Sequence, residues 1–382
     1  MSKGKIMKVF PGGNTSHGFF SLYNYIIPQD TTRIFVIKGG PGVGKSTFMK
    51  KICESMINRG FDAEWHCCSS DNGSIDGIVF PQLGIAMIDG TAPHIVDPKN
   101  PGAVDEIIHL GDYWNESMMR QAKDGVLADN RRVGRLFGMA YFALQEAMVA
   151  MTEWESCVSE SQNWPKVNKT FSAAWEEVMG GTNPHWDVIP VDRHLFAWAI
   201  SPQGKVNFID SLLSGIDSLY LIEGEPGTGK STFISNFGHR AMEWGLDVEF
   251  YHSTLNPDDV DGIIIRKLGI AMFSAGGPFA YKPLEYHGFQ KRIDLSVSLN
   301  DEVLRVYAAE IKAASNRFNQ HMERAISHIA QAKATHDHME TYYIPAMDFA
   351  AIEKRRLEIE LRILGYADEL AKAASASGGR II

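Results

Sequence analysis

Residues 39–47 read GGPGVGKST, and residues 224–232 read GEPGTGKST. Both stretches fit the pattern G-x-x-x-x-G-K-[ST], in which glycines allow a tight loop whose backbone N–H groups surround a phosphate. An apolar run precedes each stretch, RIFVIKG at 33–39 and SLYLIEG at 218–224, and an amphipathic segment follows it. This order of strand, loop and helix is the context in which the pattern marks a P-loop, so the sequence predicts two of them.

The two stretches belong to a longer internal repeat. Gly39 and Gly224 lie 224 − 39 = 185 residues apart, and segment 61–87 aligns at the same offset, without a gap, with segment 246–272. Upstream of the loops a parallel continues at an offset of 186, so the second copy begins near residue 190. Recurrence over this length indicates duplication. We expect one P-loop domain at 1–188 and another at 189–382.

The predicted fold class is α/β, with a mainly parallel sheet covered by helices in each domain. A second strand pattern follows each amphipathic segment, which gives the β-loop-α-β order of a parallel sheet. Beyond residue 113 apolar side chains such as Leu136, Ala140 and Leu144 recur at helical spacing. We therefore expect a helical hairpin appended to each sheet, at about 113–180 and about 298–375. These tails are interpreted as packing elements, with a mobile lid as the alternative.

A P-loop binds the phosphates of a nucleotide through several groups. Lys45 and Lys230 would reach the β and γ phosphates, and the hydroxyls of Ser46 and Ser231 would contact magnesium. We thus expect ATP or a related nucleoside triphosphate, with Mg²⁺, at both loops. The expected binding residues are Gly39, Gly40, Pro41, Gly42, Val43, Gly44, Lys45, Ser46 and Thr47, and Gly224, Glu225, Pro226, Gly227, Thr228, Gly229, Lys230, Ser231 and Thr232.

The two copies differ at the acid that usually accompanies a P-loop. The apolar run LGIAMID ends on Asp89, which has the form of a magnesium-associated carboxylate, whereas the matched position of copy two is Ser274. We therefore expect catalysis in copy one, with Lys45, Asp89 and Asp76 as catalytic residues and with Ser46, Asp89 and Ser231 as metal ligands. Copy two would bind nucleotide more passively. The alternative for Asp89 is capping of the turn Asp-Gly-Thr-Ala-Pro at 89–93.

Other polar residues are weaker candidates. Asp76 recurs in copy two as Asp261, and either residue could position water or simply cap a turn. His94 could act as a base or a substrate contact in copy one, because Phe279 replaces it in copy two. Four tail arginines could contact phosphate, although a solvated helix face is the favoured explanation. They are Arg120, Arg132, Arg305 and Arg317.

Composition narrows the class of protein. The formal net charge of −9 lacks the basic excess that nucleic-acid binding usually requires, so we expect no nucleic-acid partner. The most apolar helical stretch is interrupted by Gln145 and Glu146, so neither a membrane span nor a membrane partner is expected. We expect a cytoplasmic protein with free thiols, because four cysteines in so long a chain do not form a disulfide framework.

With both P-loops, the segment DGTAPH at 89–94 and the segment RHLFAWAISPQG at 193–204, the chain resembles a little-studied bacterial family of tandem P-loop proteins. Its members are described as ATPases or nucleotide kinase-like proteins. The resemblance covers essentially the whole chain and implies ATP binding. The family pattern also has an Asp in the second DG-type turn, and Ser274 departs from it, which argues against hydrolysis in copy two.

Three functions remain open from the sequence. The first is a Mg²⁺-dependent ATPase in which domain 1 is catalytic and domain 2 more passive. The second is a kinase for a nucleotide or small metabolite, because no glutamate adjoins Asp89 to activate water. The third is a non-catalytic module that recruits a protein partner when nucleotide is bound.

Overall fold

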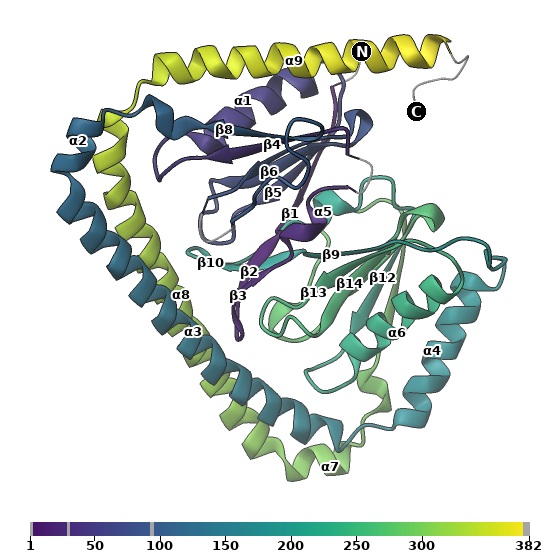
Figure 1. Cartoon of the computed structure of the whole chain (residues 1–382). Coiled ribbons are helices and arrows are strands. Elements are labelled where there is room, and N and C mark those ends of the chain that lie inside the picture. The colour runs from purple at the N-terminus through teal and green to yellow at the C-terminus, as the bar shows by residue number, and fades with distance from the viewer. Residues whose placement is uncertain (1–2, 29–30, 92–94, 377–382) are drawn as a thin grey trace. The chain divides into compact units, whose positions relative to one another are not determined.

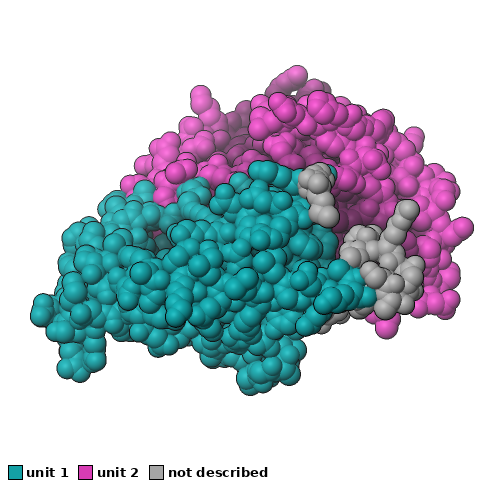
Figure 2. Space-filling view, turned by 90° about the horizontal axis from the view of Figure 1, so that it is seen from above, with its two compact units in different colours: residues 1–11, 21–137, 330–382 teal, residues 12–20, 138–329 magenta. Residues whose placement is uncertain are grey.

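The computed structural model describes residues 3–28, 31–91 and 95–376. Contacts divide the chain into two compact units, each built from separate segments (Figure 2). Unit 1 comprises residues 1–11, 21–137 and 330–382, and unit 2 comprises residues 12–20 and 138–329. The α/β class is confirmed, because two six-stranded, mainly parallel sheets are accompanied by helices.

Unit 1 holds the sheet of the first sequence copy. Its strands are β1 (Ile6–Val9), β4 (Arg33–Lys38), β5 (Ala63–Cys67), β6 (Ile75–Phe80), β7 (Ile85–Asp89) and β8 (Asp105–His109). They lie in the order β1-β5-β6-β7-β4-β8, and only β6 runs antiparallel to its neighbours. Its helices are α1 (Lys45–Asn58), α2 (Glu116–Gln121), α9 (Phe349–Ala376) and parts of α3 (Lys123–Ser159) and α8 (Ala308–Tyr343).

Unit 2 holds the sheet of the second copy. Its strands are β9 (Asp192–Phe196), β12 (Ser218–Glu223), β13 (Val248–His252), β14 (Val260–Ile265), β15 (Ile270–Ser274) and β16 (Phe289–Asp294). Their order, β16-β12-β15-β14-β13-β9, repeats the order of the first sheet at matched positions. Two hairpins accompany the sheet, β2 (Gly12–Thr15) with β3 (Gly18–Ser21) and β10 (Trp198–Ser201) with β11 (Gly204–Asn207).

The remaining helices of unit 2 are α4 (Trp164–Met179), α5 (Ile209–Leu212), α6 (Lys230–Glu243), α7 (Asp301–Val306) and the other parts of α3 and α8. Short 3₁₀ helices join many elements. They are η1 (Tyr23–Tyr25), η2 (Pro81–Leu83), η3 (Leu110–Tyr113), η4 (Arg266–Leu268), η5 (Gly277–Phe279), η6 (Ser296–Ser298) and η7 (Ile344–Ala346). Pro345 lies in η7, which separates α8 from α9.

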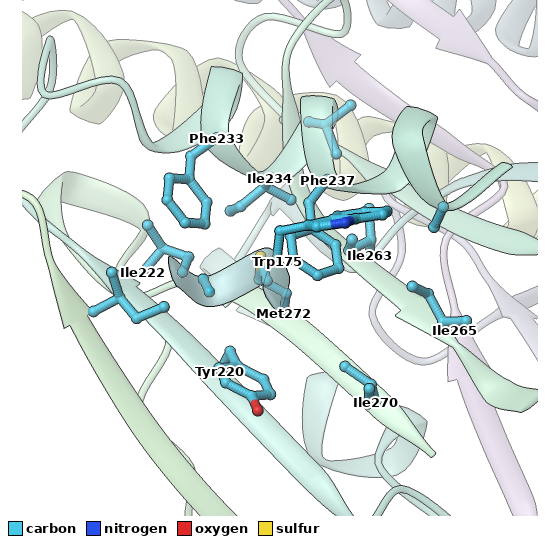
Figure 3. Packing of buried hydrophobic residues seen from close by; sticks show 14 of the residues in the cluster. Trp175, Tyr220, Ile222, Phe233, Ile234, Phe237, Ile263, Ile265, Ile270 and Met272 are labelled. Atoms are coloured by element: carbon cyan, nitrogen blue, oxygen red, sulfur yellow. The ribbon is translucent and has the colours of Figure 1, made fainter. Parts of the chain in front are cut away.

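Helix α4 follows the first copy in sequence but packs in the core of unit 2 (Figure 1). Trp175 of α4 lies 5.1 Å from Phe237, measured between ring centroids (Figure 3). It lies 5.5 Å from Trp244. Phe171 of α4 lies 5.1 Å from Phe233 of α6. The first of these pairs is tilted and the other two are edge-on, and such aromatic pairs add to the stabilisation from apolar burial. The first tail thus helps to form the core around the second copy's sheet.

Helix α9 makes the reciprocal arrangement in unit 1. Lys51 of α1 donates to Glu353 of α9 at 2.9 Å, and Arg362 of α9 bonds Glu106 of β8 at 2.6 Å. The hydrogen bonds from Arg362 are the main reason that the pKa of Glu106 falls to about 2. Charge-assisted hydrogen bonds therefore join α9, the last helix of the second tail, to α1 and β8 of the first copy.

The last helix of each tail thus packs on the other copy's sheet, an arrangement called here the exchange of the tails. We had expected each tail to pack on its own copy's sheet. The physical reason for the exchange is helix length, because α3 and α8 contain 37 and 36 residues. At a rise of about 1.5 Å per residue, each helix extends for about 55 Å. The helix that follows each one, α4 or α9, belongs to the unit that holds the other copy's sheet. Within the described ranges no helix combines the length and apolar character needed to cross a membrane.

Candidate functional site

Two glycine-rich loops occupy equivalent places in the two sheets. Loop 1 (residues 39–47) joins β4 to α1, and loop 2 (residues 224–232) joins β12 to α6. Gly42 and Gly44 have φ angles of 65° and 89°, and Gly227 and Gly229 have 88° and 92°. Residues with a Cβ rarely adopt this left-handed backbone, so the glycines are required by the turn. Each loop leads directly into the N-terminus of a helix, where backbone N–H groups and the dipole attract anions.

The lysine of each loop folds back over its own backbone. Lys45 Nζ donates to the carbonyls of Gly39 and Gly40, both at 2.9 Å. Lys230 Nζ donates to the carbonyl of Glu225, also at 2.9 Å. Burial lowers the pKa of Lys230. The ammonium group of each lysine therefore lies against the backbone of its own loop, just before the helix begins.

A serine hydroxyl and an aspartate meet beside each loop. Ser46 Oγ accepts from the backbone N–H of Ile75 at 3.1 Å, and Ser231 Oγ accepts from that of Val260 at 3.1 Å. The next residue along each strand is Asp76 or Asp261. Because β6 and β14 run antiparallel to their neighbours, their first residues reach the edge where the parallel strands end. This topology brings the two predicted aspartates to the loops.

Both aspartates are held in poorly solvated surroundings. Burial raises the pKa of Asp76 to about 7, and the nearby Asp89 adds to the increase. Asp76 accepts a hydrogen bond from the hydroxyl of Tyr23 at 2.7 Å, which partly opposes that increase. Burial and the neighbouring Asp259 raise the pKa of Asp261 to about 6. The Oδ2 atom of Asp261 is buried without a hydrogen-bond partner.

Asp89 ends β7 and has two contacts. Its Oδ1 accepts from the backbone N–H of Thr91 at 2.9 Å, and its Oδ2 lies 3.6 Å from Lys45 Nζ. The side chain therefore caps the turn and also neutralises part of the lysine charge. Ser274 ends β15 at the matched place, so Lys230 has no carboxylate at that position. His94 lies outside the described residues.

A cavity of about 420 Å³ adjoins loop 2 within unit 2. Its polar lining includes Lys230, Ser231, Asp261 and Ser274. Its apolar and aromatic lining includes Met148, Met151, Trp164, Leu255 and Phe279. Small-molecule sites in proteins commonly have this volume and this mixture of apolar walls with a few polar groups.

Helix α3 supplies a carboxyl group to this cavity. Glu155 lines it, and burial together with Asp259 raises the pKa of Glu155 to about 7, while Lys230 acts in the opposite direction. A Cβ on Gly227 would lie only 2.3 Å from the carbonyl oxygen of Glu155. The absence of a side chain at Gly227 is thus what allows α3 to approach loop 2 so closely.

The second tail covers loop 1 with residues at the matched register. A Cβ on Gly42 would lie 3.2 Å from Cβ of Glu340, which is the counterpart of Glu155 because 155 + 185 = 340. A Cβ on Gly40 would lie 2.7 Å from the ring of Tyr343. These tail residues were not predicted as site residues, because the tails were interpreted as packing elements. The available signal was a glutamate at the common offset.

The arginines proposed as phosphate contacts lie on exposed helix surfaces. Arg120 pairs with Glu116 at 2.8 Å on α2, and Arg317 of α8 bonds Glu153 of α3. Arg132 and Arg305 are also exposed. The four cysteines are free thiols, as expected.

Comparison of the chain with models of protein families, with curated protein sequences and with solved structures gave no match. What the two loops bind is therefore inferred from their own residues and geometry.

Proposed function

We propose that the chain binds a nucleoside triphosphate, ATP with Mg²⁺, at both loops, which act as P-loops. The observation that supports this proposal is that one arrangement occurs twice. In each copy a left-handed glycine turn precedes a helix N-terminus, a lysine folds over the turn, and a serine hydroxyl lies beside a buried aspartate. Loop amides, helix dipole and lysine charge all favour a polyanion at this place.

The donor set fits a magnesium ion that accompanies the phosphates. Mg²⁺ usually binds one or two carboxylates and keeps its other positions for water and phosphate oxygens. Asp261 Oδ2 is buried without a hydrogen-bond partner, and a cation would satisfy it. Burial raises the pKa values of Asp76 and Asp261 by more than the nearby Lys45 and Lys230 lower them, so a further cation would stabilise each carboxylate. When bound, the ion would offset charge on the phosphates.

Loop 1 is the proposed site of ATP hydrolysis. Asp89 lies 3.6 Å from Lys45, whereas the matched Ser274 brings no charge to Lys230. The lysine and the carboxylate of loop 1 would hold the terminal phosphate and its cation in a fixed geometry. A kinase reaction would instead require an acceptor, and phosphate release with and without pooled small metabolites distinguishes the two reactions.

The direct test is titration calorimetry of the full chain with ATP and Mg²⁺. We expect two sites per chain. Lys45→Ala and Lys230→Ala should each weaken one site by at least about tenfold, because each removes a charge-assisted contact to phosphate.

Lys51→Ala is the matched control for loop 1, since Lys51 lies on the same helix and pairs with Glu353. It should leave both sites intact. Absence of binding in the unaltered chain, or two sites that survive both loop substitutions, would overturn the proposal.

A further inference from the structure

Two aromatic residues occupy the same register in the exchanged tails. Trp164 is the first residue of α4 and Phe349 the first residue of α9, and 164 + 185 = 349. A Cβ on Gly229 would lie 2.7 Å from Cζ3 of Trp164, and a Cβ on Gly44 would lie 3.7 Å from Cε1 of Phe349. Each ring therefore lies beside the last glycine of a loop, directly before the loop lysine.

The position of Trp164 is fixed by its neighbours in sequence. Gln162 is buried, and its Nε2 donates to the carbonyl of Thr228 in loop 2 at 2.9 Å. The side chain of Asn163 caps the start of α4 by accepting from the N–H of Lys166 at 3.2 Å. Trp164 is thus attached to the loop on one side and to a helix on the other.

The side chain of Trp164 is partly exposed to solvent, so a ligand can contact its ring. Trp164 is 41% exposed and Phe349 is 44% exposed, so part of each ring is free to contact a ligand. Trp164 also lines the cavity whose polar wall contains Lys230 and Ser231. An aromatic wall next to an anion-binding wall is complementary to a nucleotide, which joins a flat base to charged phosphates.

We propose that Trp164 stacks on the base of the nucleotide whose phosphates bind loop 2, and that Phe349 does the same at loop 1. This inference rests on the proposed function. Stacking on an aromatic ring tolerates all bases because every base has a π-face. Each loop is therefore completed by a base-binding residue from the other sequence copy, and discrimination between ATP and GTP is weak.

The test compares ATP with inorganic tripolyphosphate, which presents three phosphates without a base. It uses the full chain with Lys45→Ala, so that loop 2 dominates binding. Trp164→Ala should raise the Kd for ATP about tenfold and leave that for tripolyphosphate unchanged. Trp164→Phe should restore most of the ATP affinity. Trp186→Ala, at a tryptophan that is 75% exposed and does not line the cavity, should change neither Kd.

The possible outcomes distinguish failure of the stacking proposal from failure of the proposed phosphate binding. Equal weakening of ATP and tripolyphosphate by Trp164→Ala would mean that Trp164 only supports the loop, which overturns the stacking. ATP that binds the Lys45→Ala chain no more tightly than tripolyphosphate would also overturn it, while the phosphate site stands. Failure of both ligands to bind the unaltered chain would overturn the proposed function and the stacking together.

Discussion

Replacement of Asp89 by asparagine is expected to lower ATP turnover by about 100-fold or more while changing nucleotide affinity only a few-fold. The carboxylate lies 3.6 Å from Lys45 and close to Asp76, so its charge acts where the terminal phosphate would react. Removing an interaction that strengthens in the transition state lowers turnover more than binding. Asparagine retains an oxygen that can accept from Thr91, so the turn is preserved and the charge alone is removed. Phosphate release and calorimetry measure the two effects.

Ser274→Ala is the matched control, because Ser274 occupies the same place in the second sheet. We expect it to change turnover by less than about threefold, because a neutral hydroxyl contributes little charge compensation. Turnover that survives Asp89→Asn but disappears with Lys230→Ala would transfer the reaction to loop 2. Tight ATP binding without phosphate release or transfer would support the non-catalytic module instead.

If the reaction occurs at loop 2 instead, Glu155 is the candidate general base. This side chain lines the cavity with Lys230 and Asp261, and its pKa is raised to about 7. A general base is most effective when its pKa lies near the working pH. The second copy therefore lacks the acid at position 274 but obtains another carboxyl group from α3. Loop 1 has the matched glutamate Glu340 as well as Asp89, so the difference between the copies at Asp89 and Ser274 remains.

Features set by local sequence were predicted well. The apolar runs that became β4 and β12, and the helices that begin at Lys45 and Lys230, follow from hydrophobic pattern and glycine placement. The repeat also predicted that the second sheet would match the first, which the strand orders show. The predicted Ser46 and Asp76 lie together because Asp76 follows Ile75, whose backbone binds that serine.

Features set by long-range packing could not be predicted. The stripe on α3 is apolar at helical spacing, and nothing in that pattern states which sheet it contacts. Trp175 of α4 likewise packs on Phe237 of the other copy, a contact that no local pattern specifies. Glu155 and Trp164 entered the candidate site only through this exchange. Their counterparts at the common offset, Glu340 and Phe349, were visible in sequence but had no assigned role.

The ionisation of Asp76 gives the last prediction, which concerns folding stability. Its pKa rises from 3.8 to about 7 on folding, chiefly because the carboxyl group is buried. Below about pH 4 the acid is protonated in both states and has no net effect. Between about pH 4 and pH 7 the unfolded chain ionises it first, so the free energy of unfolding falls as pH rises. The whole decrease is on the order of 4 kcal/mol at most, from about 1.4 kcal/mol per pKa unit.

Asp76→Asn should remove this dependence and retain an acceptor for the Tyr23 hydroxyl. The difference in the free energy of unfolding between the variant and the unaltered chain should grow in favour of the variant by about 2 kcal/mol from pH 5 to pH 8. Urea unfolding at both pH values measures this difference. Asp97→Asn, at a carboxylate whose side chain is 76% exposed, should show no such gain. A stability difference that is the same at both pH values would contradict the prediction. Mg²⁺ with ATP should stabilise the unaltered chain more than the variant at pH 8, because only an ionised Asp76 gains from a nearby cation.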